Sequence, residues 1–297
     1  MLEWLGILLA LLQSACWAGT SIILRVLSKR LDAYVVNGLR SIVGWVVVVL
    51  ITFVTGGFAD WHLLTWTRLF YLVVPGILGG VFGDGLYVYS LKAIGINRAF
   101  PISNTYPIFT VLLSALLLGE PITWLMLVGM VLVLLGVYLV ARPRHSVDDA
   151  PSILPRAVLL KGILFALGSA LIWGSTAVML VLGLKGIDSA MANTVRVPAV
   201  ALIALLVAAK RGNLKEVRTL SRNTVILLVA AGVLGWGLGS WLFTSALQMV
   251  GASKTTIVGA AAPLFAVPLS MIFLHERPGR LTLVGTFLTV LGIALVV

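Results

Sequence analysis

Long apolar runs alternate with short polar or basic connections along the whole chain. A helix that crosses the hydrocarbon core of a bilayer needs about 20 predominantly apolar residues. Ten stretches meet this requirement, at approximately residues 5–24, 35–54, 69–91, 98–118, 121–140, 162–183, 189–209, 224–246, 255–274 and 280–297. The ten-residue alternation typical of barrel strands does not occur. The pattern therefore predicts an all-α polytopic membrane protein with ten transmembrane helices.

Two of the connections are longer than the others. Residues 142–161 contain three prolines and several charges, which predicts a linker between a first five-helix unit, residues 1–141, and a second, residues 162–297. Residues 210–223 are basic and are expected to lie on the membrane surface. The first span lacks the basic start of a cleaved signal peptide, because Glu3 is the only charge before it. We therefore interpret it as a mature helix.

The sequence also repeats itself. A shift of 156 residues aligns the two halves without a gap, and polar and helix-breaking residues match in the same order. Among the matched pairs are Trp17/Trp173, Lys29/Lys185, Asp32/Asp188, Asn37/Asn193, Arg40/Arg196, Gly95/Gly251, Pro107/Pro263 and Glu120/Glu276. Each half has an odd number of spans, so the second half is expected to enter the membrane from the opposite side. Such inverted repeats are a common plan of secondary transporters.

Composition agrees with a membrane protein and excludes several other classes. Charged residues make up 10% of the chain, hydrophobic residues 60%, and the mean hydropathy is +1.12. The single cysteine, Cys16, excludes a disulfide scaffold and is interpreted as a small buried apolar residue. No phosphate-binding loop, zinc pattern or nucleophile–base pair is present, so we expect neither an enzyme nor a cofactor. The net charge is +11, and the basic residues lie in the connections between the apolar runs. This distribution favours a membrane surface over nucleic acid as the partner.

Motifs at corresponding places in the two halves give the chain a resemblance to a known family. They are Trp17-Ala18-Gly19-Thr20 and Trp173-Gly174-Ser175-Thr176, the intramembrane arginines Arg40 and Arg196, the Gly-x-x-Arg/Lys segments at Gly95 and Gly251, and the endings Leu-Gly-Glu-Pro (118–121) and Leu-His-Glu-Arg-Pro (274–278). With these motifs the chain resembles the ten-span EamA-type permeases of the drug/metabolite transporter superfamily over nearly its whole length. The resemblance implies export of amino acids and related metabolites; cousins exchange nucleotide sugars or phosphorylated sugars.

Two departures limit what the resemblance implies. The segment Gly251-Ala252-Ser253-Lys254 lacks the asparagine of the Gly-Ala-Leu-Asn-Lys element of nucleotide-sugar carriers. The small four-span multidrug cousins use a glutamate midway along their first helix, where this chain reads Leu12-Gln13-Ser14-Ala15. Export of lipophilic cations by that mechanism is therefore not expected.

Charged residues inside the spans are the first candidates for a substrate site. Asp84 is the only carboxylate deep inside a span, and a lone ionisable group there is a functional-site candidate by default. It can bind a substrate amine or carry a coupling proton, or it can be a structural residue paired with Arg40. Arg40 and Arg196 can bind backbone carbonyls in a structural role or recognise a substrate carboxylate. Arg98 and Lys254 open spans 4 and 9, where they can bind an anion together with the helix dipole or anchor the helices at the interface.

Glycines and prolines mark where a cavity is expected. Glycines at spacings of three and four residues lie along one face of spans 3 and 8, and prolines interrupt spans 4 and 9. We expect the cavity to be lined by polar and aromatic side chains next to these features, namely Tyr87, Asn104, Tyr106, Trp236 and Trp241. A structural or gating role is assigned to Trp17, Trp173, Pro107 and Pro263, beside Arg40 and Arg196. Glu120 and Glu276 stand before helix starts and are interpreted as helix caps.

The distribution of basic residues predicts the orientation. Sixteen Lys and Arg residues fall in the connections on one face of the membrane and three on the other, Arg68, Lys185 and Lys254. The positive-inside rule then places both termini outside, although ten-span relatives are usually drawn with both in the cytoplasm.

We predict a monomeric secondary transporter of the bacterial inner (plasma) membrane that exports amino acids, aromatic ones included. The alternatives are an exchanger of organic or sugar phosphates and a non-transporting membrane scaffold or sensor.

Overall fold

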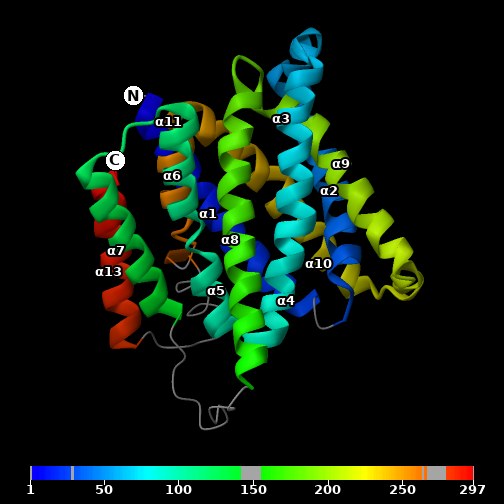
Figure 1. Cartoon of the computed structure of the whole chain (residues 1–297). Helices are drawn as coiled ribbons and strands as arrows, with labels where there is room; N and C mark the ends of the chain where they lie inside the picture. Colours follow the sequence, from blue (N-terminus) through cyan, green and yellow to red (C-terminus); the bar gives the residue numbers. More distant parts are fainter. Residues whose placement is uncertain (1, 28–29, 142–154, 263, 266–278, 297) are drawn as a thin grey trace.

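The computed structural model describes residues 2–27, 30–141, 155–262, 264–265 and 279–296. Throughout these ranges the chain folds into helices and contains no strand. The helices lie side by side as a bundle (Figure 1). Pro263, Glu276 and most of the linker 142–161 lie outside the described residues.

The first half begins with two uninterrupted helices, α1 (Leu2–Leu27) and α2 (Ala33–Thr55). After them come a 3-10 segment η1 (Gly57–Leu63), α3 (Trp66–Ile77), a π-helical segment η2 (Leu78–Gly83), α4 (Asp84–Ile94), α5 (Ile96–Ser103), α6 (Tyr106–Leu118) and α7 (Trp124–Ala141). The expected interruption of span 4 lies between α5 and α6, and Pro107 sits in the first turn of α6.

The second half follows the same order. It contains α8 (Arg156–Leu184), α9 (Ser189–Lys210), a 3-10 segment η3 (Asn213–Thr219), α10 (Arg222–Ala231), a π-helical segment η4 (Gly232–Gly239), α11 (Ser240–Gly259) and α13 (Arg280–Val296). The segments η1 and η3 differ by 156 residues at both ends, the shift that aligns the sequence. Within α11, Gly251 has a non-helical conformation with φ 77°.

Seven helical stretches of the described residues are long and apolar enough to cross a membrane, and α7 and α13 are shorter apolar helices. The chain is therefore a multi-pass membrane protein. The longest stretch, Arg222–Gly259, includes the predicted eighth span and the start of the predicted ninth. The non-helical residue Gly251 lies between these two parts. The sequence pattern did not predict the π-helical turns inside spans 3 and 8.

Helices of the two halves pack against each other, and two of these pairs, α2/α9 and α7/α13, are equivalent under the 156-residue shift. The helix α2 starts after Asp32, whose carboxylate accepts a hydrogen bond from Tyr34 N, and α9 starts after Asp188, which accepts from Ala190 N and Met191 N. Such caps satisfy backbone donors that a helix start leaves unpaired. The helices α2 and α9 are in contact with each other, α1 packs against α11, and α7 packs against α13. In Figure 1, α7 and α13 form the left edge and α2, α9 and α10 the right side.

The contacts at the ends of α2 and α9 are reciprocal. Asp60 in η1 accepts a hydrogen bond from Asp188 N at 2.6 Å, and Glu216 in η3 accepts one from Asp32 N at 2.8 Å. Residue 216 corresponds to residue 60, and residue 188 to residue 32, by the same shift. Since the end of each helix meets the start of the other, α2 and α9 run antiparallel.

Candidate functional site

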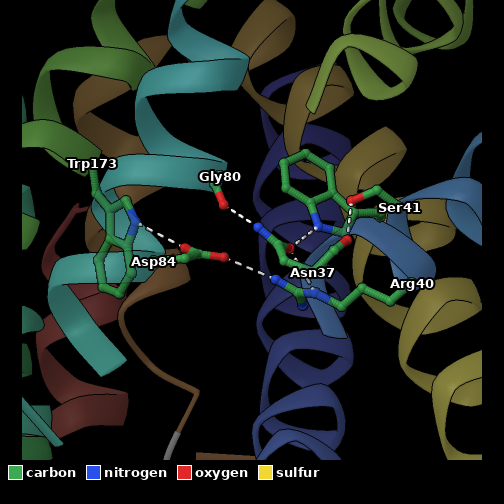
Figure 2. Close-up of polar contacts among 7 residues, drawn as sticks. Asn37, Arg40, Ser41, Gly80, Asp84 and Trp173 are labelled. Carbon is green, nitrogen blue, oxygen red and sulfur yellow. Dashed lines mark hydrogen bonds and ion pairs between the residues drawn. The ribbon is translucent and has the colours of Figure 1, made fainter. Parts of the chain in front are cut away.

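A buried ion pair lies in the interior of the bundle. The Arg40 Nη2 atom of α2 is 2.8 Å from Asp84 Oδ2 at the start of α4, and the two side chains are 3% and 22% exposed. The other carboxylate oxygen, Oδ1, accepts a hydrogen bond from Trp173 Nε1 of α8 at 3.2 Å (Figure 2). Asp84 therefore connects three helices, and the structure places it in the paired arrangement that the sequence left open as one alternative.

Asn37 organises the guanidinium from the preceding turn of α2. Its Oδ1 atom accepts hydrogen bonds from Arg40 Nε at 2.9 Å and from Trp236 Nε1 at 3.1 Å. Its amide nitrogen donates to the carbonyl of Gly80 in η2 (Figure 2). Sequence reasoning did not include Asn37 in the site. The signal was present, because Asn37 and Asn193 match under the 156-residue shift and each precedes its arginine by one turn.

The second half contains the corresponding arrangement. Arg196 Nε donates to Asn193 Oδ1 at 2.9 Å, and Arg196 Nη2 donates to Ser240 Oγ at 2.5 Å. Ser240 stands where the first half has Asp84, and its hydroxyl also donates to Asn193 Oδ1 at 2.7 Å. We call Asn37–Arg40–Asp84 the first triad and Asn193–Arg196–Ser240 the second triad.

The indole of Trp236 lies against both triads. The Arg40 Cζ atom is 5.9 Å from the centroid of this ring, and Arg196 Cζ is 5.7 Å from it. Such positions attract a guanidinium to the negative face of the ring. The side chains of both arginines are buried, and Arg40 Nη1 has no hydrogen-bond partner among the described residues. The two triads contain two cations and one carboxylate, so their fixed charges leave one positive charge in excess.

Aromatic rings gather on the other side of Asp84. The ring of Trp173 has its centroid 6.4 Å from that of Trp17, 5.3 Å from that of Tyr87 and 6.2 Å from that of Tyr106. The Tyr106 hydroxyl donates to the carbonyl of Thr256 at 3.2 Å. We call these four residues the Trp173 cluster. Its rings come from α1, α4, α6 and α8, so the cluster includes helices of both halves.

The π-helical turns position these groups. The segment η2 ends directly before Asp84, and η4 carries Trp236. A π-helical turn shifts the register of the following residues, and such turns are frequent at functional sites. A Cβ atom on Gly80 would lie 2.7 Å from Trp236 Cζ2, and one on Gly83 would lie 2.8 Å from Trp173 Nε1. Glycine at these two positions therefore lets both indoles approach the backbone of η2.

The structure does not bring every predicted residue to this group. Lys254 forms an ion pair with Glu3. Arg98 is exposed at the start of α5. The Asn104 amide donates to the carbonyl of Phe100 at 2.9 Å, and Trp241 is half-buried in the first turn of α11. Pro263 lies outside the described residues.

Glu120 caps a helix, but the helix belongs to the other half. Its Oε1 and Oε2 atoms accept hydrogen bonds from Ala252 N at 2.8 Å and Ser253 N at 3.0 Å, directly after the break at Gly251. The sequence predicts this cap at the start of the neighbouring span, because a capping pattern relates only residues that are close in sequence. A Cβ atom on Gly251 would lie 2.6 Å from Glu120 Oε1, so both the contact and the positive φ require glycine there.

Comparison with known proteins agrees with this architecture. The EamA-like transporter family matches residues 4–142 and, a second time, residues 160–297. An uncharacterized transporter of Archaeoglobus fulgidus is 26% identical over 292 residues, which cover 98% of this chain and 97% of that protein. A probable 4-amino-4-deoxy-L-arabinose-phosphoundecaprenol flippase subunit ArnF of Photorhabdus laumondii is 33% identical over 74 residues, 24% of this chain and 59% of that protein.

A solved crystal structure shares the fold, with a TM-score of 0.77 and 18% identity over 98% of this chain and 95% of that one. The names of the matched family and of the full-length relative indicate a transporter and not an enzyme. Because the family match covers nearly the whole chain, the chain belongs to the EamA-like transporter family.

Proposed function

We propose that the chain is a secondary transporter that exports amino acids, aromatic ones included, by alternating access. In this proposal ten membrane-crossing helices form two inverted repeats, 1–141 and 162–297, related by a rotation of about 180° around an axis in the membrane plane. The antiparallel packing of α2 and α9 and the reciprocal contacts of Asp60 and Glu216 support the inversion. The working unit is a monomer in the bacterial inner membrane, with both termini outside.

The charge pattern of the two triads carries the proposal for the substrate. An amino acid brings one ammonium and one carboxylate. Asp84 offers a carboxylate to the ammonium, and the guanidiniums of Arg40 and Arg196 offer donors to the carboxylate. The Trp173 cluster adds aromatic faces next to Asp84, which attract both an ammonium and an apolar or aromatic side chain.

One observation favours a second candidate. Arg196 is buried, and the partners given above for its guanidinium, Asn193 and Ser240, are uncharged. A dianionic substrate compensates two guanidiniums better than a zwitterion does, so exchange of organic or sugar phosphates is the alternative.

Counterflow in proteoliposomes distinguishes these candidates. Vesicles loaded with an unlabelled solute are exposed to the same solute in labelled form, with protein-free vesicles as the control. We expect phenylalanine to be exchanged. Its decarboxylated and deaminated analogues should compete roughly 10- to 100-fold more weakly, because each lacks one charged hydrogen-bonded group. Exchange of sugar phosphates without amino acids would favour the second candidate, and exchange of no solute would favour a non-transporting scaffold.

We further propose that Asp84 couples transport to proton movement. It is paired with Arg40 in the structure, and a state in which this pair opens leaves a carboxylate that must be protonated or bound to substrate. The test is Asp84→Asn, measured separately for substrate-driven pH change and for counterflow. Loss of the pH change with counterflow retained supports coupling. Wild-type transport that ignores an imposed pH gradient would contradict it.

A further inference from the structure

An open apolar groove lies between α2, η2, α4 and α8. Its volume is about 370 Å³, and it is lined by residues of α2, η2, α4 and α8, namely Tyr34, Leu78, Phe82, Leu86, Tyr89 and Ile172. Phe82 is 50% exposed, although it belongs to a membrane-spanning stretch. In a membrane the surroundings of such a surface are lipid chains, so a lipid chain is the natural occupant of the groove.

A cation contacts two of the residues that line the groove. The Arg211 guanidinium, just after α9, donates from Nη1 to Tyr89 Oη at 2.7 Å, and its Cζ atom lies 4.6 Å from the ring centroid of Tyr34 and 5.9 Å from that of Tyr89. Both tyrosines also line the groove. The two rings hold the guanidinium by stacking and hydrogen bonding, and these two partners are neutral. The Asp32 carboxylate attracts it electrostatically from farther away, and the exposed guanidinium can also contact an anion.

The position of Arg211 suits a lipid headgroup. It lies in the basic connection 210–223 and is exposed, as are Lys210, Lys92 and Lys161. The positive-inside rule places this end of the bundle at the cytoplasmic leaflet, whose anionic lipids attract basic groups near the interface. Apolar contact alone does not select one lipid, because lipid tails are as apolar as the groove. Selection must come from the headgroup.

From these contacts we propose that the groove binds one anionic phospholipid, with an acyl chain along Phe82 and Leu86 and the phosphate on Arg211. The groove and the first triad share the same helical stretches, because Phe82 and Leu86 lie two residues before and after Asp84 and Ile172 directly precedes Trp173. The site is separate from the proposed substrate site, and its test does not depend on transport.

The test is lipid retention by the purified full-length protein, measured by native mass spectrometry with dioleoyl-phosphatidylglycerol and, separately, dioleoyl-phosphatidylcholine. We expect the wild type to retain one phosphatidylglycerol at least tenfold better than phosphatidylcholine. Arg211→Gln should lose this preference, and the matched control Lys210→Gln, which removes the neighbouring exposed charge, should keep it. Leu86→Trp fills the groove and should reduce retention of the lipid while Arg211 is intact.

Three results would overturn the proposal. Equal loss in Lys210→Gln would mean that general surface charge holds the lipid. Undiminished retention in Leu86→Trp would mean that the groove does not hold the chain. If Arg211→Gln retained phosphatidylglycerol as well as the wild type does, Arg211 would not be the residue that binds the headgroup. Because Arg211 is exposed, its replacement is expected to leave folding intact, and the thermal midpoint of each variant checks this.

Discussion

At the scale of single residues, the Arg40–Asp84 ion pair places two charges in the interior of the bundle at a cost in solvation. Taking two ions out of water is costly, and a buried pair adds little net stability compared with an apolar pair of similar volume. Each partner nevertheless depends on the other, because removing one leaves an uncompensated charge in the interior. The hydrogen bonds from Trp173 and to Asn37 hold the pair in one geometry. Stability alone therefore does not explain the pair, which supports a role in transport.

Asp84→Asn should lower the free energy of unfolding by about 3 kcal/mol, near the lower end of values for broken buried pairs because Asp84 is partly exposed. The double variant Arg40→Met/Asp84→Leu should regain most of this stability but no counterflow. Thermal unfolding in one detergent, together with counterflow, measures both quantities. A double variant that transports like the wild type would show that the pair is only structural.

Trp173→Phe removes the indole donor to Asp84 and keeps an aromatic ring in the Trp173 cluster. We expect substrate affinity to fall roughly tenfold, since a hydrogen bond to a charged group contributes about 1.5 kcal/mol or more. Trp17→Phe is the matched control, since Trp17 contributes its ring to the cluster while the donor to Asp84 belongs to Trp173. Equal effects of both substitutions on counterflow half-saturation would assign the role of Trp173 to ring packing instead.

At the scale of elements, the π-helical turns η2 and η4 determine which side chains meet. Gly80 in η2 lies against Trp236 in η4, and the Asn37 amide donates to the Gly80 carbonyl. The backbone of one half is therefore in direct contact with an indole of the other. An added side chain at this contact must move a ring that stacks near two arginines.

Gly80→Ala should destabilise the protein by about 1–3 kcal/mol, the range for overpacking, because the new Cβ would lie 2.7 Å from Trp236 Cζ2 and 2.9 Å from Val200 Cγ1. Gly19→Ala in α1 serves as the control, since its nearest neighbour would be Leu234 Cδ1 at an ordinary 3.5 Å. That substitution should be neutral or stabilising by about 0.5 kcal/mol. Thermal midpoints check both values, and an unchanged midpoint for Gly80→Ala would contradict the tight contact.

The elements also show what the sequence can predict. Apolar run length predicted the helices, and the corresponding caps Asp32 and Asp188 agree with the repeat. The π-helical turns were missed, because a glycine pattern does not distinguish a π turn from close helix packing. Of the residues that the sequence selected, Asp84, Arg40, Tyr87, Tyr106 and Trp236 lie in or against the triads and the Trp173 cluster, and their roles in transport stay predictions. Asn37 and the partner of Glu120 were missed, because both depend on contacts across the bundle that no local pattern encodes.

At the scale of the whole molecule, the 156-residue shift relates contacts as well as residues. Asp60 meets Asp188 and Glu216 meets Asp32, as expected where a two-fold axis exchanges the two halves. The segments η1 and η3 lie at opposite ends of the bundle (Figure 1). If the bilayer crosses the bundle between these ends, equivalent residues face opposite sides of the membrane.

Phe58 and Leu214 provide a matched pair for testing this topology, because they are equivalent positions and are exposed to 41% and 38%. In a Cys16→Ser background, we expect Phe58→Cys to react in intact cells with a membrane-impermeant maleimide. Leu214→Cys should react only after the cells are opened, as the positive-inside rule predicts. Labelling of both from the same side would contradict the inverted arrangement, and the reverse order would contradict only the orientation.

The cap that Glu120 provides has a consequence for biosynthesis. Ala252 and Ser253 are buried, and a buried N–H without an acceptor costs about 1–3 kcal/mol. The acceptor lies 132 residues upstream of Ala252, so the ribosome completes the carboxylate long before these two amides emerge. In the natural order of synthesis, the Glu120 carboxylate is therefore already present when the helix that begins at Ala252 forms. A circular permutant that begins in the second half would reverse this order and expose the two amides until Glu120 arrives.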